Sequence, residues 1–129
     1  RTAILKLEKR WCSMEAKRRD VTIHKKILRE IADIEAFIAN ETEESFAQSR
    51  LAQKAVMMTL INIAELSKSF SEEYRLATGS IPWKEIRGLR NIAAHQYEII
   101  RPANIWLTIT QDVPALKNEL LAHPPEENS

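Results

Sequence analysis

The sequence predicts an all-α fold, a four- to five-helix up-and-down bundle, from two observations. Glycine is scarce: Gly79 and Gly88 are the only two in 129 residues, whereas the tight hairpins of a β-sandwich need residues that adopt positive φ. Isoleucine and leucine recur at helical spacing along much of the chain. Apolar residues make up 44% and charged residues 29%, a composition that excludes a disordered chain and a membrane protein and indicates one folded domain. The scarcity of glycine also excludes glycine-rich loops that bind dinucleotides or phosphates.

The first helix of the bundle is expected at about 21–39. Its isoleucines follow one another at steps of four, four, three and four residues, which places them on one helical face: Ile23, Ile27, Ile31, Ile34 and Ile38. Asp20 is expected to be the N-cap of this helix and Asn40 its C-cap. A polar connection over 41–45 follows, and then a short helical turn around Phe46.

A long helix is expected at 51–70. Its apolar residues point in nearly every direction, which predicts the central, buried helix of the bundle. Met57 and Met58 are interpreted as adaptable packing in that core. Ser71, followed by two glutamates, is read as the cap of a short helix that ends before Gly79.

Two more helices complete the predicted bundle. Ser80 and Pro82 are expected to open a helix that reaches about His95, because serine caps a helix and proline is tolerated in its first turn. Arg101-Pro102 starts the last helix, in which Pro114 predicts a kink. Residues 123–129 are expected to form a disordered tail.

Residues 1–19 are expected to be a basic N-terminal extension of a helical domain at 20–122. Seven lysines and arginines stand against two glutamates in this stretch. Such an arm could contact nucleic acid, or it could be a solvated helical extension. The chain begins with Arg1, and Met14 is interpreted as the native start, so that residues 1–13 would be upstream or vector-derived sequence.

Cysteine usage and hydropathy indicate a cytoplasmic protein without membrane contact. Cys12 is the only cysteine, so the chain forms no internal disulfide and no thiolate metal cluster, which fits a reducing cytoplasm. The longest strongly apolar stretch, 55–64, contains Thr59 and Asn62 and is too short to cross a bilayer.

The segment Arg90-Asn91-Ile92-Ala93-Ala94-His95-Gln96-Tyr97 holds the candidate chemistry. Asn91 and His95 are four residues apart and so share one face of a helix. Arg90 is five residues before His95, a rotation of about 140°, so the two converge only through a long side chain or a helix end near the histidine. His24 and His123 have no partner at metal-ligand or triad spacing and are interpreted as surface residues; no metal site is expected.

Imidazole, guanidinium and amide groups at one helix end suit the cleavage of RNA by its own 2′-hydroxyl. That reaction needs a proton acceptor, a proton donor and a cation for the phosphorane, and an imidazole with a pKa near 6.5 exchanges protons at neutral pH. Guanidinium binds phosphate oxygens in a fork-shaped geometry. One chain supplies one imidazole, so a two-fold dimer facing two such helix ends would complete the site. A surface ion-pairing role for Arg90 and His95 is the alternative on spacing alone.

The motif from Ile81-Pro82-Trp83 to His95-Gln96-Tyr97, followed by a helix with Asp112-Val113-Pro114-Ala115-Leu116, resembles the HepT-like toxins of the HEPN (higher eukaryotes and prokaryotes nucleotide-binding) superfamily. The segment 51–67, which contains Ile63-Ala64-Glu65-Leu66, is similar to the long second helix of that family. The resemblance covers about residues 20–121, and the arm at 1–19 has no counterpart in it.

This resemblance implies an all-helical homodimer that acts as a metal-independent endoribonuclease toxin without a cofactor. Arg90 and His95 match the catalytic pair of the family, and Asn91 matches the polar residue after the arginine. Tyr97 matches the tyrosine to which a minimal nucleotidyltransferase antitoxin adds AMP, which would place negative charge where substrate phosphate should bind. A half-buried Tyr97 that braces the helix end is the alternative.

Substrate phosphates would be attracted by a modest set of cations along one stretch: Lys84, Arg87, Arg90 and Arg101. We expect weak, salt-sensitive and largely sequence-tolerant RNA binding from so few charges. Trp83 and Trp106 could stack bases, but their spacing fits core or dimer packing better. Two alternatives to a nuclease stay open: a non-catalytic HEPN-type module that binds a nucleotide or a partner, and a plain helical scaffold dimer.

Overall fold

The computed structural model of the chain describes the backbone of residues 2–96 and 100–126 and the side chains of 3–91 and 100–126. Within these ranges the chain forms helices and turns and no strand. The helices, in chain order, are α1 (Thr2–Ile38), α2 (Glu43–Gln48), α3 (Arg50–Ser67), α4 (Glu72–Ala77), α5 (Trp83–Gln96), α6 (Pro102–Leu107), the π-helical segment η2 (Thr108–Asp112) and α7 (Val113–Ala122). The predicted all-α class is confirmed.

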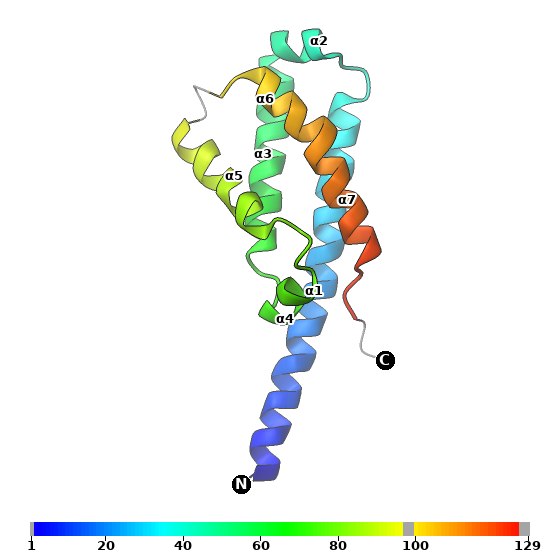
Figure 1. The fold of residues 1–129 in the computed structure, drawn as a ribbon, viewed down its shortest axis with the longest axis vertical. Coiled ribbons are helices and arrows are strands. Elements are labelled where there is room, and N and C mark those ends of the chain that lie inside the picture. The colour runs from blue at the N-terminus through cyan, green and yellow to red at the C-terminus, as the bar shows by residue number, and fades with distance from the viewer. Residues whose placement is uncertain (1, 97–99, 127–129) are drawn as a thin grey trace.

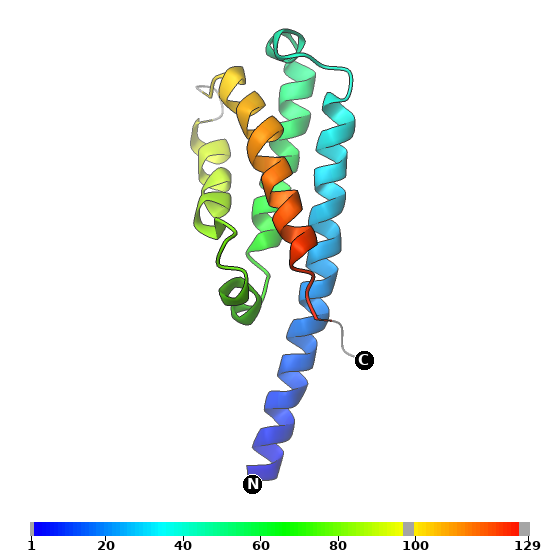
Figure 2. The ribbon, with the colours of Figure 1, turned by 45° about the vertical axis from the view of Figure 1, so that its right-hand side comes forward.

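The long helices alternate in direction, as expected for an up-and-down bundle (Figures 1 and 2). Helix α1 runs up, α3 returns beside it, α5 lies on the other side of α3, and α6, η2 and α7 run as one rod against α1. The short helices α2 and α4 lie at opposite ends of the bundle. None of the helices in the described ranges is both long and apolar enough to cross a membrane.

The core is built on the isoleucine face of α1, as the spacing predicts. Ile23, Ile27, Ile31 and Ile34 are buried, and they meet buried residues of α3 and α7, including Val56, Leu60, Ile63, Val113, Leu116 and Leu120. Phe46 of α2 is fully buried against the ring of Trp106, with the ring centroids 5.4 Å apart. Helix α3 is buried along much of its length, and Met57 packs in the core as predicted. The same interpretation is wrong for Met58, which is 60% exposed, because one side of α3 faces away from the other helices.

Asp20 is not the N-cap of the first helix, because α1 passes through it without a break. The residues before Asp20 include no glycine or proline and are rich in lysine, arginine and glutamate, which favour helix. Asp20 is instead buried, and its carboxylate accepts hydrogen bonds from the Ser71 backbone N–H at 2.7 Å and the Ser71 hydroxyl at 2.5 Å. Since Ser71 is the N-cap of α4, this carboxylate fastens α4 to α1.

The basic arm is the projecting end of α1. The first turns of α1 extend beyond the rest of the bundle (Figures 1 and 2), with Ile4, Leu7 and Trp11 exposed. The last part of the arm contacts the bundle, since Arg19 donates to the Ser69 carbonyl at 2.9 Å. The arm is therefore a helical extension, which is one of the two alternatives that the sequence left open. That it contacts nucleic acid, and that residues 1–13 are not native, remain predictions.

His24 is not a surface residue. It is buried, and its Nε2 lies 2.7 Å from the Leu120 carbonyl oxygen, so the imidazole links α1 to α7. The burial of His24 could have been predicted from its position, because residue 24 falls on the same helical face as the buried Ile27 and Ile31. His123 is exposed as expected, with Nε2 3.6 Å from the Glu119 carboxylate.

The segments around Pro82 and Pro114 take forms that the sequence did not predict. Ser80 does not cap α5; its hydroxyl donates to the Glu119 carboxylate at 2.7 Å, and the Pro82 carbonyl accepts the first helical hydrogen bond, from Ile86. Just before Pro114 the structure has the π-helical segment η2, whose last bond runs from the Val113 N–H to the Thr108 carbonyl; the kink expected at Pro114 stays a prediction. A proline has no N–H to continue the regular ladder, which favours such a segment just before it.

Replacing Ile34 by alanine tests the importance of the isoleucine face. Ile34 has no exposed surface, so we expect Ile34→Ala to lower the free energy of unfolding by about 2–5 kcal/mol. Leu51→Ala is the matched control, because Leu51 is 82% exposed and its loss should cost less than about 0.5 kcal/mol. Urea unfolding followed by circular dichroism measures both, and equal losses would contradict the assigned core.

Candidate functional site

Helix α5, which carries the predicted catalytic segment, is anchored at its start by aromatic packing. The Trp83 ring meets Phe70 with centroids 5.2 Å apart, and Phe70 in turn stacks on Tyr74 at 4.5 Å. The indole N–H of Trp83 donates to the Thr78 hydroxyl at 3.1 Å. Trp83 and Trp106 both pack against the core, as predicted, so the Ile81-Pro82-Trp83 motif fixes where α5 begins.

Beyond Trp83, α5 packs chiefly on α3. Buried Ile86 and half-buried Leu89 line a groove of about 430 Å³ together with Leu60 and Ile63 of α3 and residues of α7. This contact uses one face of α5 only. The opposite face is therefore left for solvent or a ligand.

The outward face of α5 carries the predicted polar residues. Lys84, Arg87 and Asn91 are exposed. At 100° per residue, Asn91 lies within about 20° of Lys84 around the helix axis, and Arg87 about 60° away. The helical backbone continues to Gln96 and so carries residue 95 one turn past Asn91, while the side chain of His95 lies outside the described residues.

Arg90 lies on the flank of this face, about 120° from Lys84, and is held towards α3. Its Nε is 2.5 Å from Oε1 of Glu65, with the two side chains 50% and 43% exposed. Glu65 also lies 3.7 Å from the Lys68 ammonium group. The structure thus joins Arg90 to a carboxylate that the sequence did not single out, although Glu65 stands in the segment that resembles the second helix of the family.

The other predicted site residues lie beyond α5. Arg101 is exposed and occupies the N-cap position of α6, where its side chain makes no capping hydrogen bond. Tyr97 lies outside the described residues. Over 3–91 and 100–126, no group of three histidine, cysteine or acidic side chains is arranged to hold a metal ion.

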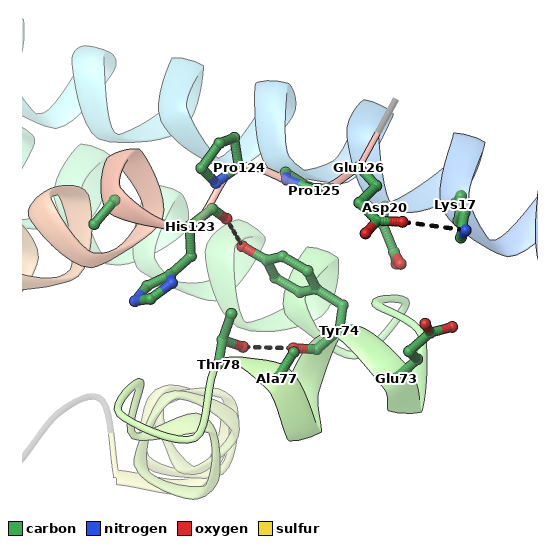
Figure 3. Close-up of a pocket in the computed structure, with 11 residues that line it drawn as sticks. Lys17, Asp20, Glu73, Tyr74, Ala77, Thr78, His123, Pro124, Pro125 and Glu126 are labelled. Carbon is green, nitrogen blue, oxygen red and sulfur yellow. Dashed lines mark hydrogen bonds and ion pairs between the residues drawn. The ribbon is translucent and has the colours of Figure 1, made fainter. Parts of the chain in front are cut away.

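An open hollow of about 310 Å³ lies away from the C-terminal half of α5, where α1, α4 and the C-terminal segment meet (Figure 3). The Tyr74 hydroxyl donates to the His123 carbonyl at 2.7 Å, and Lys17 pairs with Glu126 at 3.2 Å. Residues 123–126, part of the predicted disordered tail, thus contact α1 and α4; residues 127–129 lie outside the described residues. Burial raises the pKa of Tyr74 to about 12, and the nearby Asp20 carboxylate adds to the shift.

Comparison with known families identifies the family to which the chain belongs. Residues 27–122 match the family described as Ribonuclease HepT-like, a range that includes α5 with positions 90 and 95 and excludes the basic arm. Because the match spans most of the chain, the chain belongs to the HepT-like ribonuclease family. The resemblance noted from the motifs around α5 is confirmed.

Individual relatives agree with this assignment. The chain is 34% identical over 105 residues to a Methanocaldococcus jannaschii protein named as a gamma-glutamylcyclotransferase and putative RNase; the match covers 81% of this chain but only 47% of that protein. It is 32% identical over 94 residues to a putative RNase of the same organism, covering 73% and 86% of the two chains. It is 31% identical over 100 residues to the “Probable ribonuclease HepT” of Thermococcus cleftensis, covering 74% and 91%. No solved structure matches the chain.

The raised pKa of Tyr74 predicts a loss of stability in strong alkali. An unfolded tyrosine ionises near pH 10, whereas the folded one holds its proton to about pH 12, so the stabilisation is complete below pH 10 and is lost as the pH rises to 12. We expect the stability of Tyr74→Phe to fall less over this window.

Tyrosinate absorbance measures this pKa directly. The chain has two tyrosines, so a Tyr97→Phe background leaves Tyr74 as the only titrating phenol. A midpoint at pH 10 in the folded protein would contradict the burial of the Tyr74 hydroxyl.

Proposed function

We propose that this chain is a metal-independent endoribonuclease toxin that cleaves RNA by attack of a 2′-hydroxyl on the adjacent phosphodiester. Arg90, Asn91 and His95 are the proposed catalytic residues. The observation that carries the proposal is the match to the HepT-like ribonuclease family over residues 27–122, which includes the whole Arg90–His95 segment. The exposure of Arg90 and Asn91 on α5 supports it.

The proposed reaction assigns one role to each group. A base removes the proton of the 2′-hydroxyl, the oxygen attacks phosphorus, and the 5′-oxygen leaves after it takes up a proton. The products are a 2′,3′-cyclic phosphate and a 5′-hydroxyl. The proposed proton carrier is the imidazole of His95, a group that as a free side chain exchanges protons near neutral pH. The Arg90 guanidinium would stabilise the negative phosphorane, and the Asn91 amide would orient a phosphate oxygen.

The proposed active form is a homodimer. One chain contributes one imidazole, whereas the reaction uses both a proton acceptor and a proton donor. A two-fold axis that faces two α5 helices across a cleft would supply His95 and Arg90 twice. The free outward face of α5 is compatible with this arrangement, since its packing on α3 occupies only the other side.

Lys84, Arg87 and Arg101 are the proposed contacts to RNA phosphates. The first two project from the outward face of α5, and Arg101 is exposed at the start of α6. Their cationic side chains would bind the backbone without reading the bases, because phosphates carry no sequence information. The proposed location is the cytoplasm, whose reducing conditions fit a chain with a single cysteine.

Neutralisation of the toxin is proposed to act on Tyr97. A minimal nucleotidyltransferase antitoxin would promote attack of the Tyr97 phenol oxygen on the α-phosphorus of ATP, forming a tyrosyl-AMP bond, breaking the α–β phosphoanhydride and releasing pyrophosphate and the phenol proton. The added phosphate would then repel substrate two residues from His95.

Loss of either proposed catalytic residue should abolish cleavage. With single-stranded RNA and excess EDTA, we expect His95→Ala and Arg90→Ala each to reduce the rate at least 100-fold, because general acid–base catalysis and phosphorane stabilisation contribute about that much. His123→Ala and Arg50→Ala are matched controls on exposed positions and should cleave as the unaltered chain does.

Two results would overturn this function. Cleavage that survives in both variants would exclude the proposed site, and cleavage that stops with EDTA would exclude metal independence. A folded chain that binds RNA or a nucleotidyltransferase without cutting RNA would favour the non-catalytic HEPN-type module.

Salt dependence should report the phosphate contacts. Each single-strand contact contributes about 0.7 to the slope of log affinity against log salt concentration, so Lys84→Ala with Arg87→Ala should lower the slope by about 1.4. Fluorescence anisotropy with a 2′-deoxy oligonucleotide measures binding without cleavage. Lys25→Ala with Lys54→Ala, on exposed parts of α1 and α3, is the control, and an equal decrease in that variant would contradict the assigned surface.

A further inference from the structure

The carboxylate of Glu65 is close enough to Arg90 to restrict the position of its guanidinium group. Glu65 belongs to α3, the helix on which α5 packs, and its Oε1 lies 2.5 Å from Arg90 Nε. Its neighbours Ile63 and Ala64 are buried, so the helix backbone carrying the carboxylate is fixed by the core. The contact therefore joins a rigid element to the flank of the outward face of α5.

An exposed arginine samples many side-chain rotamers, and that freedom is lost when its guanidinium binds a phosphate. A partner that restricts the side chain beforehand lowers this cost and holds the cation in one place. A carboxylate beside the guanidinium also carries a negative charge, which repels phosphate. Lys68, 3.7 Å from Glu65, offsets it, so the group of Arg90, Glu65 and Lys68 keeps a net charge of +1.

We propose that Glu65 is a positioning residue for Arg90: it fixes the guanidinium at the α3 edge of the candidate site, so that a substrate phosphate meets a cation already in place. This inference rests on the proposed ribonuclease function. Glu65 acts through Arg90 and takes no part in proton transfer. It should therefore affect the rate of the bound complex more than the affinity for RNA.

A second ion pair of the same kind supplies the control. Lys117 of α7 lies 3.0 Å from Glu35 of α1, with side chains 38% and 53% exposed, much like the Arg90–Glu65 pair. Exposed pairs of this sort contribute little to stability. The variants Glu65→Gln and Glu35→Gln should thus unfold at nearly the same thermal midpoint as the unaltered chain. They should differ from each other only in activity.

The test is the steady-state cleavage of a short single-stranded RNA in EDTA. We expect Glu65→Gln to lower kcat about 10- to 100-fold, as misplaced catalytic groups do, with KM changed less than threefold, and Glu35→Gln to match the unaltered chain. Glu65→Asp keeps the charge but has a shorter reach, so its kcat should fall between those of Glu and Gln. Adding Glu65→Gln to Arg90→Ala should cause no further loss, because the residues act as one unit.

A readout that needs no catalysis is the Nε–H resonance of Arg90 in nitrogen-15 NMR. It should be sharp in the unaltered chain and in Glu35→Gln, and exchange-broadened in Glu65→Gln. Equal kcat values in Glu65→Gln and Glu35→Gln would overturn the positioning role. A higher kcat in Glu65→Gln would also overturn it, because Glu65 would then be a group that the substrate phosphate must displace from Arg90.

If the unaltered chain does not cleave RNA, the proposed function is wrong, and the positioning role of Glu65 is wrong as well.

Discussion

The packing of α5 on α3 is the contact on which the rest of the site depends. Leu60 and Ile63 of α3 and Ile86 and Leu89 of α5 belong to the same hydrophobic core, and the aromatic group around Trp83 fixes the first turn. Because α5 uses one face for this contact, its polar residues are presented outward. The order in which apolar and polar residues alternate along α5 thus decides both how the helix is held and what it can offer a substrate.

Polar contacts between distant segments set the geometry of the bundle around this pair. Asp20 fastens the start of α4 to α1, and His24 joins α1 to the end of α7. Both groups are buried and satisfied, so their removal would leave an unpaired partner in a place that water does not easily reach. They hold the end of the bundle from which α5 starts, and Arg90, further along α5, pairs with Glu65 in the last turn of α3.

The sequence predicted those features that depend on local spacing. The isoleucine face of α1 and the Ser71 cap of α4 follow from periodicity and capping chemistry, and the structure confirms them. The cap predicted at Ser80 is wrong, because that hydroxyl donates to Glu119, 39 residues away. Asp20, His24 and Glu65 could not be assigned this way, because each acts on a partner 25 or more residues away whose proximity only the fold creates. In the candidate site, Arg90, Asn91 and the cations of α5 were found on exposed positions, whereas the side chains of His95 and Tyr97 lie outside the described residues and keep the roles proposed for them.

The chemical ends of the cleaved RNA test the account most directly. An oligonucleotide with one ribonucleotide among deoxyribonucleotides offers a single 2′-hydroxyl, and mass spectrometry of the two fragments identifies which bond broke. Internal attack predicts a 2′,3′-cyclic phosphate on one fragment and a 5′-hydroxyl on the other, with an all-deoxy oligonucleotide left intact. A 5′-phosphate with a 3′-hydroxyl, or any cut in the all-deoxy strand, would contradict it.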